Sequence, residues 1–359
     1  MLDYIIVGSG LAGSSFAEVT LNAKKRIIVF ENKSHNSSKV AAGLYNPVVL
    51  KRFTATPEAK EQLDLLNIFY RNIENKLNCK FLFELPVLRK FFSVEEQNNW
   101  FTASDNPLLT PFLATNLVTN KFDGVDSPFD YGRVLHTGYL DTAIFIDSYR
   151  EFLKSNSLLI EDSFEHEQLQ FEDDLIVYKN YKAKHIVFAE GFGMHSNPFF
   201  KFLPLDGTKG DILLIKAPNL SFEVIINASV FILPIGNHYF KVGATYNWHD
   251  KTTLPTDEGK QELVAKLKEI INCDFEIIEH LAGIRPTVRD RRPLLGTHSE
   301  HKNMHILNGL GTRGVMLAPY LVKALFENIE FGKELKPEMD IKRFKKKINL
   351  FLCYMKQTC

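Results

Sequence analysis

Residues 3–13 read Asp-Tyr-Ile-Ile-Val-Gly-Ser-Gly-Leu-Ala-Gly, and a second, mostly apolar run over residues 26–30 ends at the acidic Glu31. This pattern predicts a buried strand ending at Val7, a glycine turn, and a helix beginning near Leu11. The first turn of such a helix points unpaired N–H groups and the positive end of its dipole at a bound phosphate. We therefore predict a dinucleotide site, in which Glu31 accepts hydrogen bonds from the hydroxyls of an adenosine ribose.

The specificity of this pattern comes from its order. A lone GxGxxG sequence is weak evidence, but here strand, glycines, helix, second strand and acid follow one another within about 30 residues. The alternative is a tight strand-to-helix turn that packs closely and binds nothing. A carboxylate at position 31 would repel the additional phosphate of NADP, so the motif leaves FAD and NAD as candidate cofactors.

Length and composition exclude several classes of protein. A chain of 359 residues with 45% hydrophobic residues predicts two joined domains. Lys plus Arg equals Asp plus Glu at 43 each, so no overall field attracts nucleic acid or an anionic membrane. The chain has no room for a signal peptide before its first strand and no run of about 18 apolar residues, so we predict a cytoplasmic protein with no membrane segment.

The four cysteines, Cys79, Cys273, Cys353 and Cys359, show no CxxC spacing, which favours reduced thiols over disulfides or a zinc site. His298, His301 and His305 match no compact zinc signature either, so we predict no metal. The basic run over residues 342–347 is typical of a solvated last helical turn, although it is also suited to contact with tRNA or lipid.

Hydrophobic periodicity predicts the main elements. A helix is expected over residues 57–77, with Thr56 as its cap and with Leu63, Leu66, Ile68, Phe69 and Ile73 at helical spacing. A second helix should follow Asp141, with an inward face of Ile144, Phe145, Tyr149 and Phe152. Residues 210–215, 229–234 and 239–245 predict an antiparallel sheet, and the continuous apolar run from His185 predicts a strand buried in a parallel sheet.

Four stretches carry a family resemblance. Besides the N-terminal motif with Glu31, they are residues 38–47, residues 187–193, and a C-terminal block over residues 282–296 and 308–319. On these stretches the chain resembles the FAD-dependent D-amino-acid oxidase family, which includes glycine oxidase, sarcosine oxidase and the oxidase module of a bifunctional enzyme that modifies the tRNA wobble uridine. The resemblance covers nearly the whole chain.

The fold that follows is α/β, with a Rossmann-like FAD-binding domain interleaved with an α+β substrate domain built on an antiparallel sheet. The expected FAD-binding domain comprises residues 1–78, 138–207 and 283–345. The expected substrate domain comprises residues 79–137 and 208–282, and residues 346–359 form a C-terminal tail.

The resemblance implies FAD as the cofactor. Relatives similar to sarcosine oxidase attach their flavin through a cysteine near the block 282–296, and this chain has none there, so the FAD should be bound non-covalently. The residues expected to bind it are Gly8, Ser9, Gly10, Leu11, Ala12, Gly13, Glu31, Asn32, Ala42, Gly43, Leu44, Ala189, Gly191, Gly309, Gly311, Thr312, Arg313 and Gly314.

Within that set, the glycines at 309, 311 and 314 lead into a helix expected to start near Met316. Backbone N–H groups at such a loop can face a developing anion, and in the family this helix end lies against the flavin edge that becomes negative on reduction. The alternative is a glycine-rich loop that only precedes the helix.

Three residues are expected at the substrate: Arg285, Tyr246 and Arg313. The resemblance places the arginine matching Arg285 over the flavin, where its planar guanidinium would hold a substrate carboxylate at two points. The alternative is a structural ion pair between Arg285 and Asp290. Tyr246, like Tyr139 and Tyr239, could instead serve only in packing. Arg313 departs from the amino-acid oxidases and is similar to the tRNA-modifying module.

The leading functional hypothesis is an enzyme that oxidises the C–N bond of a small amino acid or N-substituted glycine, by hydride transfer to flavin N5 with O₂ as acceptor. A second hypothesis keeps this chemistry but takes the carboxymethylaminomethyl group of a tRNA wobble uridine as substrate, which the neutral net charge disfavours. A third is a catalytically silent FAD-binding scaffold or partner subunit. An NAD-linked dehydrogenase leaves Arg285 without a role, and the oligomeric state is not predicted.

Overall fold

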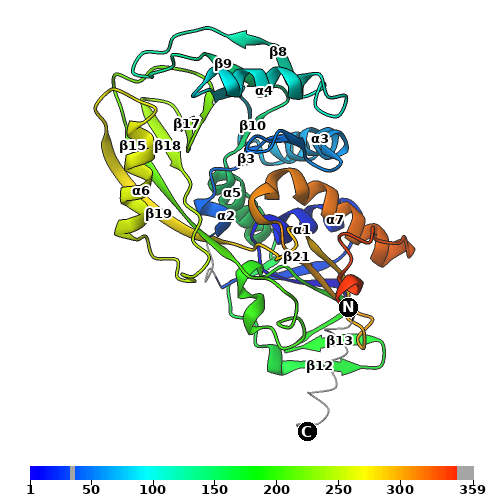
Figure 1. Ribbon diagram of the computed structural model, residues 1–359. Coiled ribbons are helices and arrows are strands. Elements are labelled where there is room, and N and C mark those ends of the chain that lie inside the picture. Colours follow the sequence, from blue (N-terminus) through cyan, green and yellow to red (C-terminus); the bar gives the residue numbers. More distant parts are fainter. Residues whose placement is uncertain (33–36, 346–359) are drawn as a thin grey trace. The chain divides into compact units, whose positions relative to one another are not determined.

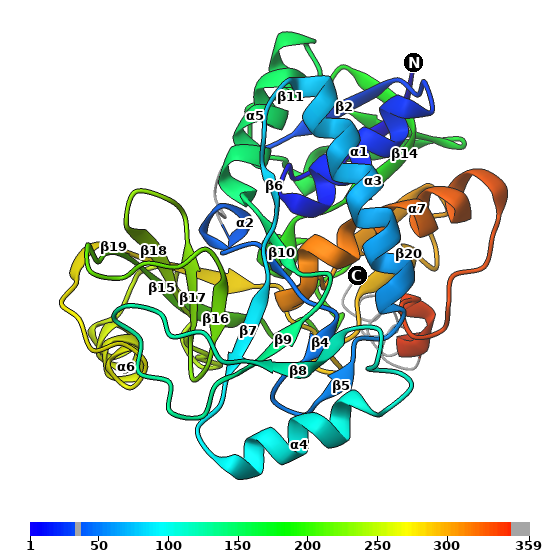
Figure 2. The same ribbon diagram turned by 90° about the horizontal axis from the view of Figure 1, so that it is seen from above.

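The structure is a computed structural model of the chain and describes residues 1–32 and 37–345. By its contacts the chain divides into two compact units, each with its own sheet (Figures 1 and 2). Unit 1 comprises residues 1–39, 143–208 and the chain from Ile284 onward, and unit 2 comprises residues 40–142 and 209–283.

Unit 1 is built on five parallel strands in the order β11-β2-β1-β14-β21. These are Leu159–Ile160, Ile27–Phe30, Leu2–Val7, Tyr181–Phe188 and Met304–Asn308. The sheet is extended by antiparallel strands: β13 (Leu175–Tyr178) pairs with β14, β12 (Leu169–Glu172) pairs with β13, and β20 (Leu294–Thr297) pairs with β21 (Figure 1). The parallel strand predicted from the run at His185 is thus confirmed as β14, at the centre of the sheet.

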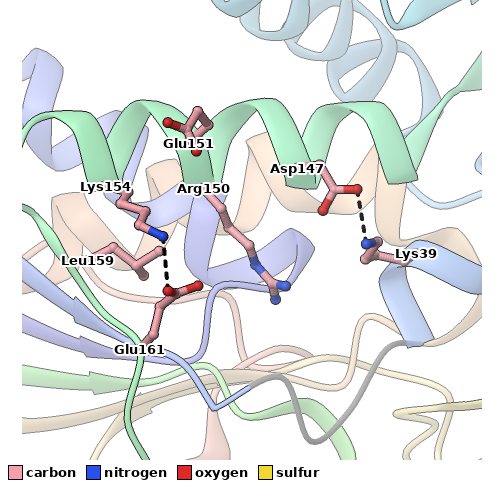
Figure 3. A pocket seen from close by; sticks show the side chains of 7 residues that line it. All are labelled: Lys39, Asp147, Arg150, Glu151, Lys154, Leu159 and Glu161. Atoms are coloured by element: carbon pink, nitrogen blue, oxygen red, sulfur yellow. Dashed lines mark hydrogen bonds and ion pairs between the residues drawn. The ribbon is translucent and has the colours of Figure 1, made fainter.

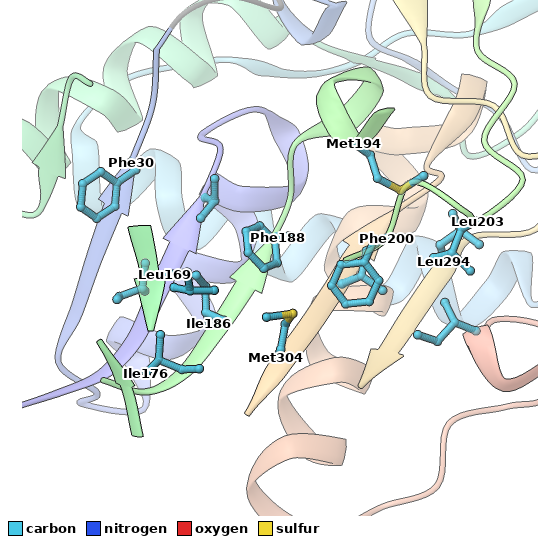
Figure 4. Packing of buried hydrophobic residues seen from close by; sticks show 14 of the residues in the cluster. Phe30, Leu169, Ile176, Ile186, Phe188, Met194, Phe200, Leu203, Leu294 and Met304 are labelled. Atoms are coloured by element: carbon cyan, nitrogen blue, oxygen red, sulfur yellow. The ribbon is translucent and has the colours of Figure 1, made fainter. Parts of the chain in front are cut away.

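Both faces of this sheet are covered, which explains why its strands are continuously apolar. On one face Tyr4 of β1 makes an edge-to-face contact with Phe16 of α1 (Leu11–Asn22). On the other face Ile5 and Val7 join a cluster that includes Phe30, Phe188 and Met304 (Figure 4). Helix α5 (Thr142–Ser155) is joined to α1 by a hydrogen bond from Tyr149 Oη to Glu18 Oε2 of 2.8 Å.

Unit 2 contains an eight-stranded sheet in the order β19-β15-β18-β17-β16-β7-β9-β8 (Figure 2). In that order the strands are Glu276–Arg285, Thr208–Lys216, Tyr239–Gly243, Phe231–Pro234, Ile225–Asn227, Val87–Lys90, Tyr131–Val134 and Leu113–Val118. Its recorded pairs are antiparallel except for β16 with β7. Leu263 and Leu267 of α6 (Asp257–Lys268) pack on this sheet. The antiparallel strands predicted over residues 210–245 are therefore confirmed.

The remaining elements of unit 2 are shorter sheets and two helices. A three-stranded sheet has the order β3-β10-β6, and β4 pairs with β5. The bounds are Leu44–Tyr45 for β3, Gly138–Leu140 for β10, Leu82–Glu84 for β6, Val48–Val49 for β4, Thr54–Ala55 for β5, Ala59–Leu77 for α3 and Val94–Ser104 for α4.

Some local predictions were wrong in detail. Helix α3 begins at Ala59 with Glu58 as its N-cap in a left-handed conformation, so Thr56 lies two residues too early to cap it. Ile68 of α3 is 63% exposed and Ile144 of α5 is 41% exposed, because each lies at the solvent side of an otherwise inward-facing apolar stripe. The predicted domain boundaries stay a prediction. Contacts group α3 with unit 2, whereas the sequence analysis placed residues 40–78 with the FAD-binding residues.

Two hydrogen-bonded imidazoles, one buried and one half-buried, lie on neighbouring strands of unit 1. His305 Nε2 of β21 lies 3.1 Å from His185 Nδ1 of β14, and His305 Nδ1 lies 2.9 Å from Thr297 Oγ1 of β20. Burial, together with the neighbouring His185, lowers the pKa of His305 to about 3. Burial also lowers the pKa of His185. Both side chains therefore fold as neutral hydrogen-bonding groups.

We expect this pair to make unit 1 sensitive to acid. An unfolded histidine titrates near pH 6.5, so the stability is fully present above that pH and is lost as the pH falls towards the folded pKa of His305. Replacement of His305→Gln keeps a neutral polar group, and between about pH 7 and pH 5 the variant apoprotein should lose about 2 kcal/mol less unfolding free energy than the unchanged protein. Urea titrations at a series of pH values measure this difference.

A matched control is His238→Asn, because His238 is exposed at a turn with positive φ that asparagine tolerates. This control should show the same pH dependence as the unchanged protein. An identical loss of stability in His305→Gln and the unchanged protein would contradict the prediction.

Candidate functional site

The predicted glycine turn brings three backbone segments into direct contact. Gly8 has φ +97°, and a Cβ there would lie 2.5 Å from the carbonyl oxygen of Ala189, just after β14. A Cβ on Gly13 would lie only 1.8 Å from the carbonyl oxygen of Gly8. The N–H of Ala189 donates to the carbonyl oxygen of Val7 at 2.8 Å. The ends of β1 and β14 and the start of α1 are therefore packed too closely for side chains.

An N–H group in the first turn of α1 finds its hydrogen-bond acceptor on another helix. Gly10 is its N-cap and offers no side chain, and the N–H of Leu11 donates instead to Ser38 Oγ at 3.1 Å. Ser38 belongs to the short helix α2 (Ser37–Val40), whose Ser37 Oγ donates to the carbonyl oxygen of Ile284 at 2.7 Å. A hydroxyl thus joins the N–H groups at a helix N-terminus, which is a suitable set of donors for a phosphate.

Glu31 is the most elaborately held side chain of the predicted site. It is 8% exposed, and its Oε2 accepts from the N–H and the Oγ of Ser9 at 2.7 and 2.9 Å. The same oxygen lies 2.9 Å from Nη2 of Arg150, whose Nε donates to Ser9 Oγ at 2.7 Å. Beside it, Asn32 Nδ2 donates to Ser163 Oγ at 3.3 Å. Arg150 was not predicted, because it lies on α5, far from the glycine motif in the sequence.

A cavity of about 440 Å³ opens beside Arg150. Figure 3 shows this side chain leaving α5 between two ion pairs, Asp147–Lys39 at 2.9 Å and Lys154–Glu161 at 3.1 Å. Both pairs are more exposed than the pair between Arg150 and Glu31.

The predicted second segment, after β14, is tied to the C-terminal block by Asn308. Asn308 Nδ2 donates to the carbonyl oxygen of Gly191 at 2.8 Å, and its Oδ1 accepts from the N–H of Gly309 at 2.8 Å. Gly191 has φ +56°, and a Cβ there would meet nothing within 4 Å. Between Ala189 and Gly191, Glu190 is held by His166 at 2.9 Å and by Asn197 at 2.7 Å.

The predicted glycine loop leads into α7 (Gly314–Phe331) through a 3-10 turn over Gly311–Arg313. A Cβ on Gly314 would lie 2.9 Å from Leu11 Cδ2, so the starts of α1 and α7 are neighbours. The N–H of Gly311 donates to the carbonyl oxygen of Pro286 at 3.1 Å, which attaches the loop to the residue after Arg285. Thr312 is exposed.

The two predicted arginines of unit 1 lie at the ends of this arrangement. Arg285 is the half-buried last residue of β19. The carboxylate of Asp290, which the sequence offered as its alternative partner, accepts from Arg343 Nε at 2.9 Å. Arg313 is the half-buried N-cap of α7, and burial lowers its pKa. Within residues 1–32 and 37–345, no acidic side chain pairs with Arg313.

The other predicted site residues belong to unit 2. Gly43 has φ +72°, and a Cβ there would lie 1.8 Å from the carbonyl oxygen of Leu140. Its neighbours Ala42 and Leu44 are buried and half-buried. Tyr246 is 58% exposed. The alternative candidates are packed: Tyr139 stacks on Phe83 with ring centroids 4.8 Å apart, and Lys216 lies over the ring of Tyr239.

The sequence analysis predicted no metal, no disulfide and no membrane segment, and these three stay predictions. In the part of the chain that the structure describes, no group of His, Cys, Asp and Glu side chains is arranged to hold a metal ion, and His298 and His301 stack on each other. Cys79 and Cys273 are free thiols, whereas Cys353, Cys359 and the predicted tail 346–359 lie outside the described residues. None of the described helices is both long and apolar enough to cross a membrane.

Comparison with known proteins decides the family. The model of the family DAO, FAD dependent oxidoreductase, matches residues 3–327. The chain belongs to this family. It is therefore an FAD-dependent oxidoreductase, and its cofactor is FAD, as the sequence analysis predicted. That the FAD is bound non-covalently stays a prediction. The match includes both the N-terminal glycine turn and the loop before α7.

The curated proteins that are similar to this chain include glycine oxidases and MnmC proteins. Glycine oxidase of Bacillus licheniformis is 25% identical over 94% of this chain and 95% of that protein. The match to glycine oxidase of Bacillus subtilis, at 23% identity, spans 58% of this chain and 60% of that protein's length. The tRNA 5-methylaminomethyl-2-thiouridine biosynthesis bifunctional protein MnmC of Campylobacter jejuni is 24% identical over 81% of this chain but only 45% of that protein.

Among solved structures, glycine oxidase from Geobacillus kaustophilus superposes with a TM-score of 0.76 at 17% identity, covering 94% of this chain and 98% of that one. At this identity the likeness shows the fold, and it confirms the predicted α/β class with its antiparallel sheet. The residues of unit 1 fit an FAD nucleotide: closely packed glycines, donors at a helix N-terminus and a buried carboxylate lie together.

We expect Gly13→Ala to lose its flavin. The added Cβ would overlap the carbonyl oxygen of Gly8 at 1.8 Å, so α1 must move away from the diphosphate-binding turn. Overpacking of this kind costs about 1–3 kcal/mol, so FAD affinity should fall by about fivefold or more. The ratio of flavin absorbance to protein absorbance in the purified variant measures the loss.

The matched control is Gly332→Asn, at the end of α7, where φ is +65° and an added Cβ would meet nothing within 4 Å. Asparagine tolerates this left-handed conformation, so the control should keep its flavin. Full retention of flavin by Gly13→Ala would show that α1 does not hold the diphosphate.

Proposed function

We propose that the protein oxidises the C–N bond of a small amine that carries a carboxylate, either an amino acid or an N-substituted glycine. The observation that supports this most directly is the placement of Arg285. Its strand ends where the N–H of Gly311 donates to the carbonyl oxygen of Pro286, so the backbone next to Arg285 is fixed to the glycine loop before α7. The names of the glycine oxidase relatives agree with a substrate of this class.

The role proposed for Arg285 follows from the shape of its side chain. A guanidinium presents parallel N–H donors that hold a carboxylate at two points and so fix its orientation. Orientation matters here because positioning is the main contribution that a protein makes to a cofactor-dependent oxidation. Tyr246 and the residues Ala42 to Leu44 are proposed to contact the substrate and the flavin, as the family resemblance implies.

The proposed reaction passes two electrons from the substrate to the flavin and then to oxygen. When bound, FAD supplies the two-electron acceptor that takes a hydride from the α-carbon. The substrate nitrogen loses a proton, and water hydrolyses the resulting imine to a carbonyl acid and an amine. Molecular oxygen takes the two electrons with two protons and gives hydrogen peroxide. The chain contributes the cation that orients the carboxylate and the helix N-terminus that favours negative charge.

Arg313 is proposed to stabilise the negative charge that reduction places on the flavin. A cation at a helix N-terminus is opposed by the helix dipole, and burial of Arg313 adds to this cost, as its lowered pKa indicates. Because no acidic side chain among the described residues offsets the charge of Arg313, an anionic ligand would do so.

We predict that Arg285→Leu raises KM for carboxylate substrates by about a hundredfold or more, because the loss of a two-point charged contact costs several kcal/mol. The variant should still bind FAD, since the glycine loop is attached through the backbone of Pro286. Anaerobic reduction of the flavin by a panel of D-amino acids, glycine, sarcosine and modified tRNA, followed in the visible spectrum, measures the effect and identifies the substrate.

Arg289→Leu is the control for this experiment. Arg289 lies four residues further along the chain, is exposed, and pairs with Asp206 at 3.3 Å, so its removal should leave KM unchanged. Unchanged kinetics in Arg285→Leu would overturn the role proposed for Arg285. Failure of every amine on the panel to reduce the flavin would favour the silent scaffold instead.

A separate prediction concerns the flavin rather than the substrate. Arg313→Met should weaken binding of sulfite to the oxidised flavin by about tenfold and lower the two-electron midpoint potential by about 30 mV, which are equivalent changes for such a couple. Arg313→Lys keeps the charge and should recover most of both values. Equal potentials in the Met variant and the unchanged protein would remove Arg313 from this role.

The second candidate substrate is a carboxymethylaminomethyl group on tRNA, which is itself an N-substituted glycine. The observation that favours it is the similarity to MnmC over 81% of the chain. Because the chain spans only 45% of that protein, the shared segment is compatible with either substrate. Reduction of the flavin by modified tRNA but by none of the free amino acids would favour this candidate.

The cytoplasmic location stays a prediction.

A further inference from the structure

Arg150 is a cation that lies beside the buried Glu31, and the sequence motif does not account for it. Its side chain is 11% exposed, and its guanidinium makes two contacts: Nη2 to Glu31 Oε2 at 2.9 Å, and Nε to Ser9 Oγ at 2.7 Å. Ser9 closes the triangle, because its own Oγ and N–H donate to Glu31 Oε2. The three side chains therefore fix one another.

The energetics of this triangle argue against a purely structural role. A buried ion pair contributes little net stability, since removing two charges from water costs about as much as their attraction returns. Two apolar side chains of matching volume in place of Arg150 and Glu31 would be about as stable. The main effect of an ion pair at such a position is to fix the orientation of the carboxylate.

The position of this triangle of side chains shows which part of the nucleotide site it orients. Ser9 lies within the glycine turn that leads into α1, and Glu31 ends β2, so the pair joins the phosphate end and the ribose end of one nucleotide site. A diphosphate would bring negative charge close to the carboxylate of Glu31. A guanidinium between the two reduces that repulsion.

We propose that Arg150 is a positioning residue for the adenosine half of FAD: it holds the Glu31 carboxylate and the Ser9 hydroxyl in place and offsets the carboxylate charge beside the diphosphate. The role is independent of the substrate. It concerns only ligands that carry the adenosine ribose. FMN lacks the adenosine ribose and one of the two phosphates, so it gains much less from Arg150.

The test is the dissociation constant of the apoprotein for FAD, measured by quenching of flavin fluorescence. Arg150→Met should weaken FAD binding by at least about tenfold, because it removes the cation that lies 2.9 Å from the buried Glu31 carboxylate. Binding of FMN to the same apoprotein should change by less than about twofold. Arg150→Lys restores the charge without the two-point fork, so it should recover part of the loss, and that part should fall as salt is added.

The matched control is Lys154→Met. Lys154 lies one helical turn further along α5, lines the same cavity and pairs with Glu161 (Figure 3), but it makes no recorded contact with Glu31 or Ser9 within the described part of the chain. Its replacement should leave the FAD dissociation constant unchanged. A loss equal to that of Arg150→Met would assign the effect to the surface charge of α5.

A double-mutant cycle keeps the proposal testable even if Arg150→Met folds poorly. In a Glu31→Gln background the buried charge that requires Arg150 is absent, so adding Arg150→Met should change FAD affinity by less than about twofold. The proposal is overturned if Arg150→Met weakens FAD and FMN equally, if it weakens FAD equally with and without Glu31→Gln, or if it leaves FAD binding unchanged or tighter.

Discussion

The structure of unit 1 depends on one close approach between backbones. The carbonyl oxygen of Gly8 occupies the space that a side chain at Gly13 would need, so the start of α1 lies directly against the end of β1. Because the start of α7 lies against Leu11, the N-termini of two helices are brought to the same end of the sheet. Two positive helix ends side by side repel each other unless an anion lies near them. The close packing of the glycines thus produces a region of positive potential, which an anionic cofactor neutralises.

The rest of the site is assembled mainly through backbone atoms. Asn308 links the turn after β14 to the turn after β21, and Gly311 links the latter to Pro286. Apart from the side-chain amide of Asn308, these contacts involve carbonyl oxygens and N–H groups, whose positions do not depend on rotamers. The loops are consequently fixed to one another, and the two predicted arginines, Arg285 and Arg313, lie at their ends. Such an arrangement fixes the backbone positions from which the charged side chains extend.

The sequence alone was sufficient wherever the information is local. The strand, glycines and acid from residue 3 to Glu31 predicted the first βαβ segment, because turn geometry and strand burial leave direct marks on neighbouring residues. Arg150 was missed because its partner lies on another element and one arginine on a helix has no periodic signature. Thr56 was taken for a cap because residue type alone does not reveal that the chain turns at Glu58. Ser38 lay inside a recognised stretch, but its bond to Leu11 required the structure.

The order of strands in unit 1 has a consequence for biosynthesis. Leu2 of β1 pairs with Ala183 of β14, and β14 in turn pairs with β21, so the N-terminal strand and helix emerge from the ribosome long before their neighbours. The edge of β1 that pairs with β14 stays unpaired until β14 has been synthesised. The roughly 175 residues that separate β1 from β14 take about 9–35 s at ordinary translation rates. During that interval the apolar edge of β1 is exposed, and it is a natural target for a chaperone. A site that uses the starts of both α1 and α7 forms only after α7 has also been made.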